Sequence, residues 1–163
     1  MRIGIGNDLH RLIPGKPLLL GGVEIDSPTG PLAHSDGDVL IHAIIDALLG
    51  AAGMGDIGEL FPPDDERWAG ASGRSLLCIV QERVESAGFF IEHIDTVIHL
   101  EKPSLRSCKG AIADNLADIL KIPPTAVSVK AKSGEGLGPV GEGLAISAEA
   151  AVLLNHPEPD IWV

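Results

Sequence analysis

One segment of the chain carries polar side chains at a spacing that only a helix brings together. Asp38, His42 and Asp46 are four residues apart, and almost all residues around them are apolar. At about 100° per residue, this spacing places the three side chains on one line of an otherwise apolar helix, which we expect to be nearly buried. Ser35 resembles the start of a capping box, and Gly50 is the expected end of the helix. A buried polar line needs partners elsewhere in the chain.

The remaining pattern mixes strands with amphipathic helices. Apolar runs predict strands over 2–6, 94–100 and 127–131, a hairpin over 17–25 with a break at its glycine pair, and a strand over 144–154 that could pass into a helix. Amphipathic helices are expected over 75–87 and 105–120, and a long loop over 51–65. Together these elements predict an α+β fold: a two-layer single domain with helices on one face of a mixed β-sheet.

The composition limits the kind of protein. With 163 residues, the chain is long enough for one domain, which we place at 1–155, followed by a Pro-rich tail at 156–163. Cys78 and Cys108 show no pairing pattern, and we find no basic leader and no apolar run of about 18 residues, so we expect a cytoplasmic protein. The net charge of −11 and the aromatic content of 3% argue against nucleic acid as a partner.

Two segments together could hold a metal ion. Asp8 and His10 are two residues apart on a predicted strand, so their carboxylate and imidazole point the same way. With His42 from the helix, they would give two imidazoles, one carboxylate and an open fourth position, the composition of a catalytic zinc site. Asp46, one turn further along, could orient the imidazole of His42. The residues alone leave open whether His42 is a ligand or a histidine packed in the core.

An acidic chain that acts on a diphosphate needs cations in its site. Two unit charges about 4 Å apart interact by roughly 4 kcal/mol at an effective dielectric of 20, so bound metal ions would be required to reverse the repulsion. Ser133, Gly134 and Glu135 follow a predicted strand and open a Gly-rich turn. A hydroxyl, a glycine and a carboxylate suit a diphosphate bridged by Mg²⁺, although an ordinary surface turn would have the same composition.

Several motifs follow one another along the chain. They read Gly-x-Asp-x-His-Arg-Leu over 6–12, Ala-His-Ser-Asp-Gly-Asp over 33–38, and Gly-Asp-Ile-Gly over 55–58 with Phe61 and Pro62 after it. With these motifs in this order, the chain resembles the 2-C-methyl-D-erythritol 2,4-cyclodiphosphate synthase family of non-mevalonate isoprene biosynthesis, over about residues 1–154. The resemblance implies a lyase (cyclase) that converts 4-diphosphocytidyl-2-C-methyl-D-erythritol 2-phosphate to the cyclic diphosphate and CMP. It also implies a homotrimer with active sites between neighbouring subunits.

The resemblance further implies two metal sites. Zn²⁺, or another divalent transition metal, is expected at Asp8, His10 and His42. Mg²⁺ or Mn²⁺ is expected at Glu135, together with the diphosphate of the substrate.

The catalytic and substrate-binding residues are also implied by the resemblance. His34 and Ser133 are expected to stabilise the transition state, and the region 100–106 is expected to form a cytosine pocket. The full set of expected substrate contacts comprises Asp8, Leu9, His10, His34, Ser35, Asp56, Ile57, Gly58, Phe61, Pro62, Pro63, Asp64, Asp65, Leu100, Glu101, Lys102, Pro103, Ser104, Leu105, Arg106, Lys132, Ser133, Gly134 and Glu135.

Three positions depart from the family pattern. Pro63 stands where the family commonly has an aspartate, and Ser104 replaces a frequent lysine. The segment 138–143 is shorter by about two residues and lacks an aromatic residue and an arginine, so we expect a prenyl diphosphate to bind weakly or not at all. Two other functions would use the same ligands: a zinc-dependent phosphohydrolase, and a non-enzymatic metal-binding trimer.

Overall fold

The computed structural model of the protein describes residues 1–62 and 64–156. In this part of the chain, one mixed sheet has the strand order β4-β1-β7-β5-β6, and β2 and β3 form a separate hairpin. Neighbours in the large sheet are antiparallel, except β5 and β6, which are parallel. The strands are β1 (Arg2–Pro14), β2 (Leu18–Leu20), β3 (Val23–Ile25), β4 (Thr29–Pro31), β5 (Phe90–His99), β6 (Val127–Lys132) and β7 (Ala145–Asn155).

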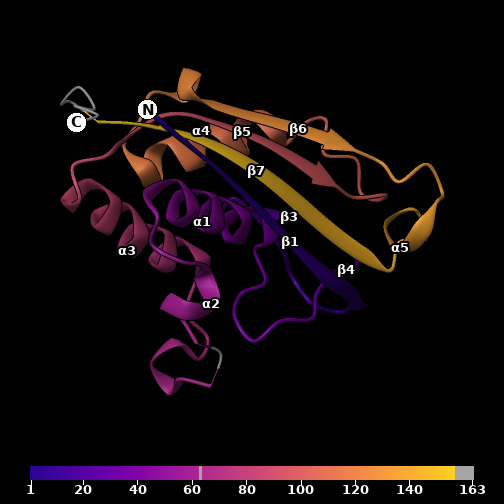
Figure 1. The fold of residues 1–163 in the computed structure, drawn as a ribbon. Coiled ribbons are helices and arrows are strands. Elements are labelled where there is room, and N and C mark those ends of the chain that lie inside the picture. Colours follow the sequence, from indigo (N-terminus) through magenta and orange to yellow (C-terminus); the bar gives the residue numbers. More distant parts are fainter. Residues whose placement is uncertain (63, 157–163) are drawn as a thin grey trace.

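The long helices lie on one side of this sheet (Figure 1). α1 packs on β1 and β7, α4 packs on β6, and α3 packs against both of these helices. The predicted α+β fold with helices on one face of a mixed sheet is confirmed. The α-helices are α1 (Val39–Ala52), α2 (Ile57–Leu60), α3 (Gly73–Ser86), α4 (Lys109–Leu120) and α5 (Gly138–Gly141), and the 3₁₀ helices are η1 (Glu66–Trp68) and η2 (Pro124–Ala126).

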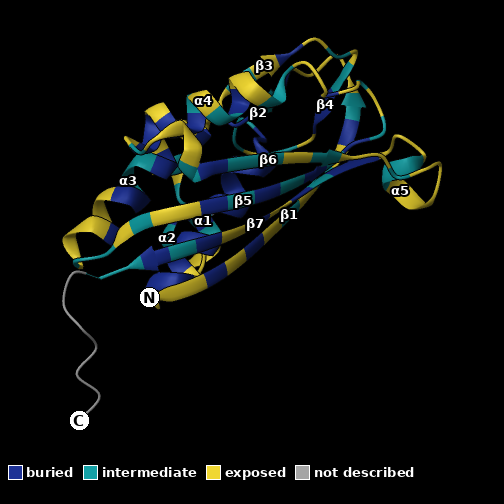
Figure 2. Cartoon of the chain, turned by 90° about the horizontal axis from the view of Figure 1, so that it is seen from above, coloured by how far each residue is buried: buried dark blue, intermediate teal, exposed yellow. Residues whose placement is uncertain are grey.

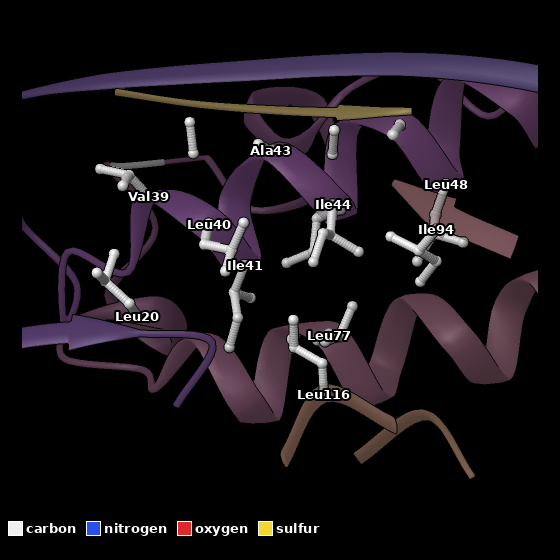
Figure 3. Close-up of a cluster of buried hydrophobic side chains, with 14 of the residues drawn as sticks. Leu20, Val39, Leu40, Ile41, Ala43, Ile44, Leu48, Leu77, Ile94 and Leu116 are labelled. Atoms are coloured by element: carbon white, nitrogen blue, oxygen red, sulfur yellow. The ribbon is translucent and has the colours of Figure 1, made fainter. Parts of the chain in front are cut away.

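α1 forms the centre of the hydrophobic core. Twelve of its 14 residues are buried, so it is covered on nearly every side. Ile41 and Ile44 point toward Leu77 of α3 and Leu116 of α4 (Figure 3). The predicted burial of this helix is therefore confirmed.

The ends of α1 differ from the prediction. The N-cap is Asp38, whose side chain accepts hydrogen bonds from the backbone N–H groups of Ile41 and, across the core, Gly21 and Gly22. The predicted cap at Ser35 is therefore wrong, and Asp38 is not part of a polar line within the helix. The helix continues through the predicted end at Gly50 and stops only at residue 53, a glycine with φ of 73° that adopts the left-handed conformation common at helix C-termini.

Two glycines bring α1 unusually close to β1. A Cβ atom built on Gly4 would overlap the carbonyl oxygen of Ala47, and one built on Gly6 would overlap the carbonyl oxygen of Ala43. Only glycine permits this approach of strand to helix. Because side chains alternate along a strand, the same face of β1 also carries Asp8, which therefore faces α1.

The opposite face of the sheet is open. Ile3, Ile5 and Leu9 alternate with the glycines of β1 and are 74%, 76% and 64% exposed. Figure 2 shows the resulting alternation of buried and exposed positions along β1 and β7. An apolar row of this kind on an open sheet face is typical of an interaction surface.

Other predicted elements differ in their bounds. The opening strand extends to Pro14, and the helix expected over 105–120 begins at Lys109. The segment expected over 144–154 is the strand β7, Ala145–Asn155, without a helical part, because β7 pairs with neighbours on both sides. The stretch expected to be a loop over 51–65 contains α2, because the Asp56 side chain accepts from Glu59 N–H and caps one helical turn. Within the described residues, no helix is long and apolar enough to cross a membrane.

Candidate active site

Asp8, His10 and His42 meet at one point between β1 and α1. Asp8 Oδ2 lies 2.8 Å from Nδ1 of His42 and 3.1 Å from Nδ1 of His10. Each residue offers one ligand atom, and these three atoms lie within 4.8 Å of one another. The prediction that the opening strand and the buried helix form one carboxylate and imidazole group is confirmed.

This group fits a shared cation. A tetrahedral zinc with bonds of about 2.0–2.1 Å keeps its ligand atoms roughly 3.3 Å apart, which is close to the spacing around Asp8. Nδ1 of His10 is buried and has no partner in hydrogen-bond geometry among the described residues. Because buried polar atoms are normally satisfied, a cation shared with Asp8 would satisfy this nitrogen better than its contact of 3.1 Å with Asp8 Oδ2 does.

The protonation states of the group suit a cation as well. Burial alone would raise the pKa of the Asp8 carboxyl, but the neighbouring His10 and His42 imidazoles lower it to about 2. Burial alone would lower the pKa of the His42 imidazole, but the hydrogen bond and the charge of Asp8 raise it. Asp8 is therefore ionised at neutral pH and favours positive charge, either a proton or a cation, beside it.

The partner of the second ring nitrogen of His42 is not the predicted one. Ser35 Oγ lies 3.3 Å from His42 Nε2, whereas Asp46 Oδ1 accepts a hydrogen bond of 2.8 Å from the backbone N–H of Ile57. The turn before α1 folds back over the ring of His42, while Asp46 reaches the chain that follows the helix. Burial raises the pKa of Asp46, and the nearby Asp56 and Asp8 charges raise it further, against the hydrogen bond from Ile57.

A first cavity of about 280 Å³ opens beside the metal-binding group. Ligand pockets typically span about 300–1,000 Å³, so this cavity fits a small ligand or one part of a larger one. Asp56 caps the turn that carries Ile57 into the wall. The predicted site residues that line the cavity are His10, His34, Ser35, His42, Ile57, Gly58, Phe61 and Pro62.

A second cavity of about 490 Å³ lies at the other edge of the sheet, where β5 and β6 end. Arg106, Lys109 and Lys132 line it, so the surroundings are locally basic in a chain with a net charge of −11. This reduces the repulsion of a diphosphate that the overall charge would suggest. The other residues around it are Leu100, Glu101, Ser104, Leu105, Ala131 and Ser133.

The loop after β6 is tied to this second cavity. Glu101 Oε2 accepts a hydrogen bond of 2.9 Å from Gly134 N–H, and Ser133 Oγ donates one of 2.8 Å to Glu135 Oε1. Lys102 and Pro103 lie next to Glu101 in the loop between β5 and α4, but they are not among the residues that line the cavity. The hydroxyl and carboxylate predicted to handle a diphosphate therefore lie next to each other.

The two cavities are separate within one chain. Asp8 pairs with Ala148, Ala148 with Ile98, and Ile98 with Ala131, so these four residues form one row across the sheet. At a strand spacing of about 4.8 Å, three steps separate Asp8 from Ala131 by roughly 14 Å. Ala131 lines the second cavity, whose described lining shares no residue with that of the first. Within one chain, the group around Asp8 and the wall of the second cavity at Ala131 therefore lie about three strand spacings apart.

Some predicted substrate contacts lie elsewhere. Leu9 points to the open face of the sheet, away from Asp8 and His10, because neighbouring residues on a strand face opposite sides. Asp65 caps η1 and pairs with Arg67 through its carboxylate, and Asp64 is exposed outside the lining of either cavity. Pro63 lies outside the described residues.

Sequence reasoning missed part of the first cavity wall. Trp68 lines it together with Ala33, Ala69 and Leu76. The Trp68 ring packs edge-on against Phe61, with ring centroids 4.9 Å apart. A large aromatic residue close to the Phe-Pro motif, in a chain with few aromatics, was the available signal.

Known proteins are similar to this chain over nearly its full length. The YgbB family matches residues 1–155. Over 154 residues, the chain is 52% identical to the 2-C-methyl-D-erythritol 2,4-cyclodiphosphate synthase of Treponema denticola, which covers 94% of this chain and 96% of that relative. It is similar to a solved structure of a 2C-methyl-D-erythritol-2,4-cyclodiphosphate synthase described as bound to CDP, with a TM-score of 0.88, 42% identity, and coverage of 94% of this chain and 100% of the other. It is also similar to the bifunctional IspDF from Campylobacter jejuni, with a TM-score of 0.91, 39% identity, and coverage of 95% of this chain and 42% of that longer chain.

Proposed function

Because the chain belongs to the YgbB family and is about half identical to 2-C-methyl-D-erythritol 2,4-cyclodiphosphate synthases, we propose that it converts 4-diphosphocytidyl-2-C-methyl-D-erythritol 2-phosphate to 2-C-methyl-D-erythritol 2,4-cyclodiphosphate and CMP. An oxygen of the 2-phosphate attacks the β-phosphorus, the bond to the CMP phosphate breaks, and CMP leaves with the electron pair. The observation that carries this proposal is the Asp8, His10 and His42 group beside an apolar cavity.

The reaction joins two parts of one molecule, so the protein has mainly to align them and to stabilise charge. We assign the sugar with its 2-phosphate to the first cavity. There, the His34 side chain and the Ser35 hydroxyl are available to phosphate oxygens, and Ile57 and Phe61 surround the carbon chain. His34 is exposed and lines this cavity, so we assign it to a phosphate that develops charge.

The metal-binding residues of this first part are Asp8, His10 and His42. Zn²⁺ or another divalent transition metal bound there would polarise a phosphate oxygen as a Lewis acid. Asp8 stays ionised at neutral pH and so keeps the site attractive to a cation. Ser35 holds the outer ring nitrogen of His42 and thereby fixes the orientation of the imidazole.

The second cavity suits the cytidine diphosphate part. The loop 100–106 and the cations Arg106, Lys109 and Lys132 surround a space larger than the first cavity. Glu135 would hold Mg²⁺ or Mn²⁺ against the diphosphate, and Ser133 would act beside it on the transferred phosphoryl group. The CDP described in a similar solved structure supports a cytidine diphosphate ligand.

We also propose that the protein is a homotrimer whose active sites lie between subunits. The separation of the two cavities within one chain supports this, because a single substrate must reach both. The open sheet face, with exposed Ile3, Ile5 and Leu9, offers an apolar surface for the contact. The segment 138–143, which includes the short α5, lacks the aromatic residue and the arginine of the family pattern, so we still expect a prenyl diphosphate to bind weakly or not at all.

The test is to incubate the purified protein with the substrate, Zn²⁺ and Mg²⁺, and to follow the reaction by phosphorus NMR. We expect signals of CMP and of the cyclic diphosphate in equal amounts. The variant His42→Ala should lose the activity, while Asp118→Ala, which removes an exposed carboxylate on α4, should keep it. A linear product would identify a hydrolase instead, and a protein that neither turns over the substrate nor binds CDP would be a non-enzymatic metal-binding protein.

A further inference from the structure

Two carboxylates fasten the wall of the first cavity to α1. At the first end of the wall segment, Asp46 Oδ1 accepts a hydrogen bond of 2.8 Å from the backbone N–H of Ile57, the first residue of α2. At the second end of the wall segment, Asp36 Oδ2 accepts a hydrogen bond of 2.6 Å from the backbone N–H of Gly73, the first residue of α3. Asp46 lies within α1, and Asp36 lies two residues before its N-cap.

Short hydrogen-bonded paths lead from these two points to the cavity. The Phe61 N–H donates to the Ile57 carbonyl over 2.8 Å, so one helical turn connects the phenyl ring to the residue that Asp46 holds. The Ala71 N–H donates to the Trp68 carbonyl over 3.0 Å, and this turn connects the indole to the segment that Asp36 holds at Gly73. The two rings pack edge-on with centroids 4.9 Å apart, and both line the cavity together with His42.

We propose that Asp36 and Asp46 are positioning residues, which set the distance between the aromatic pair Phe61 and Trp68 and the metal ligand His42. Wall and metal-binding group would then share one rigid support, α1, and the space between them would select the sugar part of the substrate by size. This inference rests on the proposed function. Neither carboxylate is among the described residues that line the cavity, and each acts through a backbone N–H group.

A role in stability alone would give a different pattern. Oδ1 of Asp36 also accepts a hydrogen bond of 3.2 Å from Asp38 N–H, so removing the carboxylate disturbs the turn before α1 as well as the wall. The contact with Gly73 must therefore be cut from the donor side too. Gly73 is the first residue of α3, where proline is well tolerated. Gly73→Pro replaces the N–H group with a ring carbon, from which the Asp36 carboxylate must move away.

The first measurement needs no activity. The chain has two tryptophans, so in a Trp162→Phe background Trp68 is the one that remains, and its fluorescence with acrylamide as quencher reports access to the wall. We expect Asp36→Ala to raise the quenching constant at least twofold and to shift the emission to the red. Asp36→Asn should stay closer to the wild-type values than Asp36→Ala, because its one amide oxygen can still accept from Gly73 N–H, while its NH2 group cannot replace Oδ1 as the acceptor for Asp38 N–H. Asp46→Ala and Asp46→Asn make the same comparison for the hydrogen bond from Ile57 N–H.

The second measurement compares kinetics. Asp36→Ala and Gly73→Pro should lower kcat/KM about tenfold to a hundredfold, mainly through KM, because contacts with the wall change little between ground and transition state. Gly73→Ala adds a Cβ 3.2 Å from Ile41 Cγ2 but keeps the N–H, so it controls for crowding. Asp118→Ala controls for the loss of a carboxylate, and the zinc content should be the same in all variants.

The outcomes separate the two proposals. If quenching in Asp36→Ala and Gly73→Pro equals that in their Asn and Ala controls, the carboxylate does not anchor the wall and the inference is overturned. If quenching rises but KM stays unchanged, the positioning role is overturned as well. A wild-type protein without cyclase activity would refute the proposed function, while the quenching series would still decide whether the two carboxylates hold the wall.

Discussion

The Oδ2 atom of Asp8 lies 2.8 Å from Nδ1 of His42, although 34 positions separate the two residues in the chain. The backbone makes this possible. Gly4 and Gly6 precede Asp8 on the same face of β1, and without their side chains the strand lies directly against the carbonyl groups of α1. The metal-binding group therefore depends on how closely one strand and one helix approach.

Substituting Gly6 with alanine should push strand and helix apart. The added Cβ overlaps the Ala43 carbonyl oxygen, and overpacking of this kind costs about 1–3 kcal/mol or more in free energy of unfolding. Because His42 is one residue away from the point of contact, zinc affinity should fall as well. Urea unfolding and zinc titration measure the two effects. Gly50→Ala, in the same helix with open space around its Cβ, should instead raise stability by roughly 0.5–1 kcal/mol.

Replacing Asp38 should destabilise the fold without removing any metal ligand. Its carboxylate is fully buried and accepts from three backbone N–H groups, those of Gly21, Gly22 and Ile41. Alanine would leave these donors without an acceptor, and one such loss costs about 1–3 kcal/mol. We expect Asp38→Ala to lower the free energy of unfolding by roughly 3 kcal/mol or more, and Asp38→Asn by clearly less. Chemical denaturation of both variants measures this, and equal losses for Ala and Asn would show that the hydrogen bonds to these N–H groups matter little.

Local patterns in the sequence were sufficient to predict the metal-binding group. Strand alternation alone places Asp8 and His10 on one face, and the apolar surroundings of His42 indicate a buried helix. The end of that helix was harder to predict, because Gly50 and Gly53 are the same residue type and only the φ angle of 73° distinguishes Gly53. Helix end and helix interior thus differ in conformation rather than in residue type.

Contacts made by returning loops could not be predicted. Asp46 was expected to face the His42 imidazole, one turn away, but the chain after α1 places Ile57 N–H against it. Ser35 reaches His42 because the turn before α1 folds over the ring. Likewise, the one sequence signal for Trp68 was its closeness to the Phe-Pro motif, and its place in the cavity wall depends on its ring packing against Phe61.

Stability of the metal-free protein should depend on pH through Asp8 and His42. The pKa of Asp8 is lowered from 3.8 to about 2, so its stabilising effect is present above pH 3.8 and is lost as the pH falls toward 2. The pKa of His42 is raised above 6.5, so its effect is present below pH 6.5 and is lost as the pH rises through the raised value. With a chelator present, the excess stability of the wild type over Asp8→Asn, measured by urea unfolding across this pH range, should be largest between these limits.

Bound zinc should reverse the pH dependence of stability that arises from His42. The metal needs the neutral imidazole of His42, so protons compete with it, and zinc affinity should rise with pH through the raised His42 pKa. Thermal unfolding with and without zinc, at about pH 5 and about pH 8, measures the stabilisation by the bound metal. A gain in Tm that is equal at both pH values would contradict the assignment of His42 as a ligand.

Mixing two inactive variants should restore activity if the site lies between subunits. His42→Ala removes a ligand at the first cavity. Glu135→Gln removes the carboxylate that accepts from Ser133, a residue of the second cavity, whose wall at Ala131 lies roughly three strand spacings from Asp8 on the same chain. In a mixed trimer, some sites combine an intact first cavity from one subunit with an intact second cavity from its neighbour. Co-expressed chains with different affinity tags, purified through both, should therefore show a substantial fraction of wild-type cyclisation. A double variant carrying both changes on one chain, co-expressed with wild type, gives the matched reference. If the mixture of single variants stays inactive while that reference is active, each site is built within one chain, and the two cavities would have to serve one substrate by some other route.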